Sequence, residues 1–175
     1  TLDIPNASAS CSYEVAERSN GNYYLFGLAL NDSLSGNDSL TIVMDPYLSE
    51  FDPTGNLVYY KYYEGATTGG AYSVNSMEIL PSDSLAFMVS VNNYVELFKT
   101  DADGERDWVT RTSNIATLTA KNPGFDFVYL PDNTYLVVCK SYSDLCVIKY
   151  DHVGNVMWTR FHRIANYSHL KSLCL

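Results

Sequence analysis

The sequence predicts an all-β fold built from repeated four-stranded antiparallel units. The chain has 15 tyrosines among its 175 residues, and aromatic side chains favour half-buried, pleated surfaces. Short apolar runs alternate with clusters of turn-forming residues. The sequence also repeats itself with a period of about fifty residues, which is the length of one structural repeat. With 46% hydrophobic and 18% charged residues, the chain can bury a substantial core.

The internal repeat is clearest between the second and third copies. Moving Leu80–Ser113 forward by 50 positions superposes it on Leu130–Arg163 without a gap. The identities comprise a Leu-Pro pair, a lysine and the pattern Asp-x-x-Gly-x-x-x-Trp. A first copy carries the same pattern with tyrosine in place of tryptophan. The repeated positions are Asp52, Gly55 and Tyr59, then Asp101, Gly104 and Trp108, then Asp151, Gly154 and Trp158.

The third copy predicts four strands. Its apolar-rich runs are Phe125–Leu130, Tyr135–Cys139, Leu145–Tyr150 and Val156–Phe161. In the last turn, Asp151 can accept a backbone N–H bond from two residues further on, and Gly154 can adopt a positive φ that a Cβ would penalise. Trp158 falls in the centre of the last strand, where a large aromatic can fill the gap between neighbouring sheets. Each repeated position therefore has a structural explanation.

Four-stranded units of about 40–50 residues are typical of β-propeller blades. We therefore expect a single partial β-propeller. Its predicted blades are 8–65, with an insertion at 31–46, then 72–113 and 122–163, followed by the start of a fourth at 164–175. Because propellers close with about four to eight blades, roughly three and a half blades would form an incomplete ring.

The end of the third copy resembles the repeat of secreted Bacteroidota propellers, in which Lys-Leu-Asp-x-x-Gly-Asn-x-x-Trp ends each blade. The match is tightest at Ile148–Trp158 and looser at Glu50–Tyr59 and Lys99–Trp108. Proteins of this family often carry a type IX sorting domain. The resemblance implies an extracellular or cell-surface protein, on the exterior of the outer membrane.

Three Asp-Ser-Leu triplets resemble the acceptor of Bacteroidota O-glycosylation. They predict glycans at Ser33, Ser39 and Ser84, in the insertion and in a turn, where a bulky group can be accommodated. The alternative is that Asp-Ser is a common turn sequence. The sequon Asn-x-Ser also occurs, which leaves a host-secreted glycoprotein open. Its positions are Asn6, Asn31, Asn37 and Asn166.

The cysteines allow one disulfide hypothesis. Cys139 and Cys146 would face each other across a hairpin whose turn is 141–144, within reach of a disulfide. Buried free thiols are the alternative. The sequence has no Cys-x-x-Cys pair and no histidine at zinc-ligand spacing, so no metal or cofactor is predicted.

The sequence matches known metal-binding and catalytic motifs only in part or not at all. Asp101, Asp103 and Asp107 surround Gly104 like the ligands of a calcium loop, but the other copies lack the second aspartate, so a plain turn is favoured. The Asp-box of sialidase-like propellers has a different spacing. Neither a Gly-x-Ser-x-Gly elbow nor a His-Glu-x-x-His pair occurs, so no catalytic residue is predicted.

Charge and hydropathy narrow the choice of partners. The formal charge of -9 and the lack of a cluster of basic residues argue against a nucleic-acid partner. The longest apolar run, Tyr23–Leu30, is too short to span a bilayer. A group of tyrosines could stack on sugar rings, with core packing as the alternative. These tyrosines are Tyr59, Tyr60, Tyr62, Tyr63 and Tyr72.

The sequence therefore predicts a non-catalytic propeller that acts as a binding or scaffold module. Its expected partners are other domains of the same polypeptide or another protein, with a glycan as a further candidate. The alternative is part of an extracellular carbohydrate-active enzyme whose catalytic residues lie outside this chain. A third interpretation is an open arc of blades wrapped around a partner subunit, which would pair the exposed blade edges.

Overall fold

Three four-stranded antiparallel sheets make up the computed structural model. The structure describes residues 7–31, 44–63, 72–91, 94–112, 124–141 and 144–163. The first sheet contains β1 (Ala7–Glu17), β2 (Tyr23–Asn31), β3 (Met44–Phe51) and β4 (Leu57–Tyr62). The second contains β5 (Tyr72–Ile79), β6 (Leu85–Val91), β7 (Tyr94–Thr100) and β8 (Arg106–Arg111). The third contains β9 (Gly124–Tyr129), β10 (Tyr135–Ser141), β11 (Asp144–Tyr150) and β12 (Val156–Arg163).

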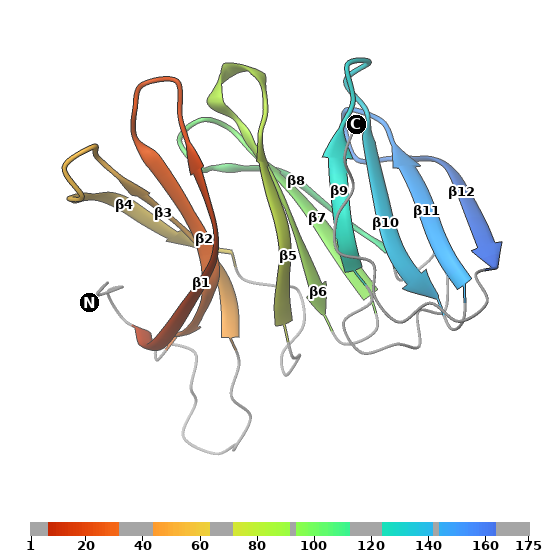
Figure 1. The fold of residues 1–175 in the computed structure, drawn as a ribbon, viewed down its shortest axis with the longest axis horizontal. Helices are drawn as coiled ribbons and strands as arrows, with labels where there is room; N and C mark the ends of the chain where they lie inside the picture. The colour runs from red at the N-terminus through yellow and green to blue at the C-terminus, as the bar shows by residue number, and fades with distance from the viewer. Residues whose placement is uncertain are drawn as a thin grey trace.

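Each sheet is a meander, since its strands are hydrogen-bonded in chain order. Figure 1 shows the three sheets side by side in the order of the sequence. The first strand of the second sheet, β5, contacts both β1 and β9. The first strands therefore gather on one side of the arc, and β4, β8 and β12 lie at the far edges of their sheets. This radial arrangement of small sheets is that of propeller blades. The predicted all-β, partial-propeller fold is confirmed.

The core lies between the sheets, and the second sheet is covered on both faces. Along β6, Phe87 and Val89 pack toward the first sheet, whereas Ala86 and Met88 pack toward the third. Strand side chains alternate between faces, so a strand buried on both sides must be apolar at every position. All seven residues of β6 are buried. Phe87 also stacks on Phe98 of β7, with ring centroids 4.9 Å apart.

The strands of the third copy lie where the sequence predicts them, with longer hairpin arms. Ser141 and Asp144 pair with each other, so the predicted turn at 141–144 is two residues shorter. In the first copy, β3 begins at Met44 and therefore takes in the end of the predicted 31–46 insertion. Pro46, which cannot donate to a strand ladder, lies opposite Leu28 and accepts a hydrogen bond from Tyr63 N at 2.8 Å.

The three Asp-x-x-Gly turns share one geometry. In each, the aspartate Oδ1 accepts hydrogen bonds from the backbone N–H groups two and four residues further on, at 2.8–3.0 Å. The glycines at 55, 104 and 154 have φ of +88°, +74° and +84°. A β-bulge follows each turn, immediately before the repeated aromatic. The repeat therefore encodes a turn and a bulge together.

The described residues contain no helix long and apolar enough to cross a membrane. The predicted start of a fourth blade at 164–175 lies outside the described residues, as do Ser33 and Ser39.

Candidate binding pocket between the second and third sheets

The repeated aromatics join one sheet to the next. Trp108 of β8 lies against Gly154 in the third sheet, and its Nε1 donates a hydrogen bond to His152 O at 3.2 Å. Tyr59 of β4 also reaches the following sheet, where its hydroxyl oxygen lies 3.1 Å from the position that a Cβ of Gly104 would take, beside the Tyr63 hydroxyl at 3.3 Å. A Cβ at position 154 would be 2.9 Å from the Trp108 ring, closer than such atoms approach in proteins. Glycine is therefore required there by packing as well as by its positive φ.

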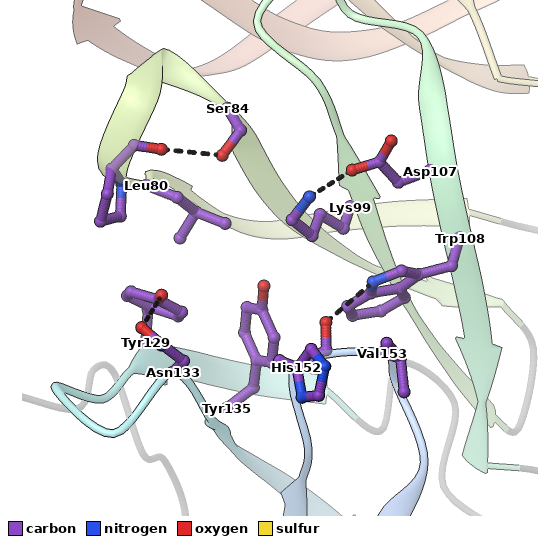
Figure 2. Close-up of a pocket in the computed structure, with 11 residues that line it drawn as sticks. Leu80, Ser84, Lys99, Asp107, Trp108, Tyr129, Asn133, Tyr135, His152 and Val153 are labelled. Carbon is purple, nitrogen blue, oxygen red and sulfur yellow. Dashed lines mark hydrogen bonds and ion pairs between the residues drawn. The ribbon is translucent and has the colours of Figure 1, made fainter.

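A pocket of about 460 Å³ opens beside this contact. Its aromatic side consists of Trp108, Tyr129 and Tyr135 (Figure 2). Trp108 meets Tyr135 edge-on at a centroid distance of 5.4 Å, and Tyr129 lies tilted against Tyr135 at 5.2 Å. Tyr135 is 1% exposed, so the neighbouring rings and sheets hold it in place. The pocket therefore has a rigid aromatic wall.

Polar groups line the rest of the pocket. Lys99 and Asp107 form an ion pair across β7 and β8. The Tyr129 hydroxyl donates to Asn133 Oδ1 at 2.7 Å, and the Ser84 hydroxyl donates to Pro81 O at 3.1 Å. Figure 2 shows these groups around a common space, with the Tyr135 hydroxyl directed into it. Leu80, His152 and Val153 complete the lining.

The equivalent space between the first and second sheets is occupied by Arg18. This side chain donates to Glu50 Oε1 at 2.7 Å, approaches Asp83 Oδ2 at 3.9 Å, and stacks on the Tyr24 ring at 4.8 Å. Arg18 and Leu80 begin equivalent turns, since the N–H of each donates to the carbonyl four residues further on. The shorter Leu80 leaves open the space that the arginine fills in the preceding interface.

Burial controls the ionisation of the groups around the pocket. The pKa of Tyr135 is raised well above its ordinary value, first by burial and then by the nearby Tyr129, Asp107 and Glu78. The pKa of Glu78 is also raised by burial, although its carboxylate accepts a hydrogen bond from Tyr129 N at 2.8 Å. The Tyr135 hydroxyl thus stays protonated at neutral pH and can both donate and accept hydrogen bonds.

The chemistry of the pocket suits binding. Among the described residues that line it, Asp107 is the single carboxylate, and Lys99 neutralises it. Glycoside hydrolysis generally needs two carboxyl groups on opposite sides of the scissile bond. Stacked aromatics beside neutral donors and acceptors instead match an uncharged ligand with one apolar and one polar face.

The structure separates the tyrosines that the sequence suggested as a sugar platform. Tyr59 and Tyr63 face the second sheet, and Tyr63 is 4% exposed. Tyr60 and Tyr62 pack against each other on the opposite face of the first sheet. Alternation along β4 causes this division, so these four residues do not form one surface. The side chain of Tyr72 lies outside the described part of the chain.

The other predicted site residues fall into distinct places. Cys139 and Cys146 lie directly opposite each other in β10 and β11, and both are free thiols in this structure, which is the alternative that the sequence left open. Asp101 caps its turn through backbone N–H groups. No group of metal-ligating side chains occurs among the described residues. Ser84 lines the pocket.

The sequence singled out Trp108, Ser84 and Asp107 among the pocket residues, and none of them as part of a pocket. Tyr129, Asn133 and Tyr135 belong to a different repeat from Trp108, and nothing in their local pattern shows which neighbour they face. The exchange of arginine for leucine at the start of equivalent turns, Arg18 to Leu80, is the signal that could have located the cavity.

The fold and its inter-sheet contacts define an incomplete β-propeller. No family model matches the sequence, and no curated protein matches it. Among solved structures, a protein of unknown function from Bacteroides caccae is similar, with a TM-score of 0.55 and 11% identity, over 90% of this chain and 47% of that one.

Two further structures give weaker matches. A protein from Bacteroides ovatus has a TM-score of 0.47 and 11% identity, over 91% of this chain and 50% of its own. The periplasmic gluconolactonase of Pseudomonas aeruginosa has a TM-score of 0.47 and 14% identity, over 90% and 55%. The chain therefore spans about half the length of these similar structures, and at such identities the likeness concerns the fold.

Proposed function

We propose that this chain is part of a non-catalytic, extracellular propeller of the secreted Bacteroidota repeat type, and that it binds a neutral carbohydrate in the pocket between its second and third sheets. The observation that carries the proposal is the wall of Trp108, Tyr129 and Tyr135 beside neutral hydrogen-bonding groups. Sugar rings present apolar C–H faces to aromatic side chains and hydroxyls to polar groups.

The neutralised Asp107 supports binding over hydrolysis. A lone carboxylate held by Lys99 is poorly placed to act as a general acid or as a nucleophile. The pocket also lies on two sheets joined by the Trp108 contact, so its shape depends on rigid elements. Rigid sites lose little entropy when they bind a ligand.

The test is a binding screen against neutral oligosaccharides, followed by calorimetry on the best binder. Val153→Arg places a long, charged side chain at the pocket rim, where Val153 is 49% exposed, and should abolish binding. Val58→Arg is the matched control, because Val58 is 54% exposed on β4, away from the pocket. Equal binding by both variants would refute the site. Release of shorter sugars during the titration would favour the carbohydrate-active enzyme.

The predicted glycan at Ser84 competes with this proposal. Since Ser84 lines the pocket, a glycan on its hydroxyl would occupy the same space as a bound sugar. Mass spectrometry of the peptide containing Ser84, from protein purified from its source, distinguishes the two. We propose that this peptide is unmodified, and that Ser33 and Ser39 carry any O-linked glycan.

A further inference from the structure

Asn133 lines the pocket with a left-handed backbone, at φ of +62°. Outside glycine this conformation is uncommon, and it recurs at ligand-binding positions. Its side-chain Oδ1 accepts a hydrogen bond from the Tyr129 hydroxyl at 2.7 Å, which fixes the orientation of the amide. Its Nδ2 donates to no residue in the part of the chain that the structure describes. The amide nitrogen is therefore left for a ligand.

The equivalent residue of the preceding interface shows how such a side chain can be used. Asp83 occupies the same place in its turn as Asn133, and its φ is +57°. Its carboxylate accepts from the backbone N–H of Ser19 at 3.2 Å and from the Ser19 hydroxyl at 2.5 Å. Pro81 stands at the position of Ser19 in the second interface, and proline has neither an N–H nor a hydroxyl. The contact that ties the first two sheets together is thus replaced by an open side of the pocket.

Apolar side chains lie across the pocket from Asn133. Figure 2 shows Leu80 and Ser84 on one side of the space, with Tyr129 and Asn133 on the other. Leu80 is 4% exposed, and Pro81 continues the lining next to it. A ligand group that fills this side of the pocket must therefore present both a hydrogen-bond acceptor and apolar surface.

We infer that the pocket selects sugars that carry an acetamido group, whose carbonyl oxygen accepts from Asn133 Nδ2 and whose methyl group packs against Leu80 and Pro81. This inference rests on the carbohydrate site proposed for the pocket. A plain hydroxyl can accept from Asn133 but brings no apolar surface to the opposite side. A free amine is positively charged at neutral pH, and the carboxylate of Asp107 is already paired with Lys99.

The first test compares sugars that differ in one substituent. Calorimetry is carried out with the β-1,4-linked trisaccharide of N-acetylglucosamine, with its deacetylated form and with cellotriose, and then with N-acetylgalactosamine and galactose. Each acetylated sugar should bind about tenfold more tightly than its hydroxyl counterpart, because one amide hydrogen bond and one buried methyl group contribute together. Equal affinity within each pair would overturn the inference and leave the carbohydrate site standing. Binding by none of these sugars, nor by any other neutral oligosaccharide, would overturn both.

Asn133→Asp tests the amide nitrogen itself. Aspartate tolerates the left-handed backbone, as Asp83 does, and still accepts from the Tyr129 hydroxyl, but it offers no donor to a carbonyl group. The variant should bind the acetylated sugar about tenfold more weakly and its hydroxyl counterpart within about twofold of the original protein.

Asn20→Asp is the matched control for this substitution. Asn20 is exposed in the corresponding turn of the first sheet, where its Oδ1 accepts from Asn22 N at 2.9 Å, as an aspartate can equally do. Both affinities should therefore stay unchanged. A preference for the acetylated sugar that survives Asn133→Asp, or that is lost in Asn20→Asp, would overturn the inference.

Discussion

Replacing Gly154 with alanine measures how strongly the second and third sheets depend on the contact with Trp108. Both Gly154 and Gly55 have a left-handed backbone, with φ of +84° and +88°. An alanine at either position loses about 1–2 kcal/mol for this conformation. At position 154 the new Cβ would also lie 2.9 Å, 3.1 Å and 3.2 Å from three atoms of the Trp108 ring, whereas at position 55 it meets nothing within 4 Å.

The difference between the two variants is therefore the cost of overpacking. Inserting a methyl group into a well-packed contact typically costs about 1–3 kcal/mol. We expect Gly55→Ala to lower the free energy of unfolding by about 1–2 kcal/mol. The expected loss for Gly154→Ala is the same amount plus the overpacking cost.

Urea denaturation followed by tryptophan fluorescence gives these free energies. With an m-value of about 2 kcal/mol/M, an added loss of about 2 kcal/mol would separate the two midpoints by about 1 M. In a Trp108→Ala background the two glycine substitutions should cost the same. Equal losses with Trp108 present would refute the proposed role of this contact.

Three further predictions concern buried polar groups. Tyr63→Phe removes the hydroxyl that donates to Gly104 O at 2.8 Å, and should lower the free energy of unfolding by about 1 kcal/mol in urea. Arg111→Gln leaves the buried Glu96 carboxylate without its guanidinium at 2.5 Å, and should cost about 3 kcal/mol at pH 7. Burial raises the pKa of Glu96, so this carboxyl group binds a proton more tightly in the folded chain than in the unfolded chain. As the pH falls toward 4.5 the carboxylate is neutralised, and the stability lost by Arg111→Gln should therefore diminish. Cys139 and Cys146 are fully buried free thiols, so iodoacetamide should label their peptides only after the protein is unfolded, and no reductant should be needed. If labelling of the unfolded protein required a reductant, the two cysteines would form a disulfide.

The sequence was most informative where the backbone itself restricts the residue. Asp151 and Gly154 revealed a turn because few other residues provide both the acceptor and the positive φ. Three copies at regular spacing then predicted the four-stranded sheets and their order. Pro46 shows the limit of this reasoning, because the predicted insertion included it but the structure places it within β3. The strand tolerates the missing N–H of this proline, and its carbonyl accepts a hydrogen bond from Tyr63 N.

The pocket was beyond sequence reasoning because it depends on which copy faces which. The pattern placed Trp108 in the centre of a strand but did not show that its ring would cover Gly154. The tyrosines of β4 looked like one cluster, although alternation divides them between two faces. The cavity opens where Leu80 stands in place of Arg18 in equivalent turns, and its size follows from the three-dimensional packing around that position.

The contact between each repeated aromatic and the following glycine turn also sets the order in which the blades of a growing chain can complete their packing. Tyr59 and Trp108 precede their glycine partners by roughly one repeat, so neither ring can be covered until the next blade has been synthesised. Domains emerge from the ribosome N-terminus first, at about 5–20 residues per second. Each new turn would then complete the hydrophobic packing of the blade before it. A nascent chain should therefore mature from its beginning, with the newest blade as its least protected part.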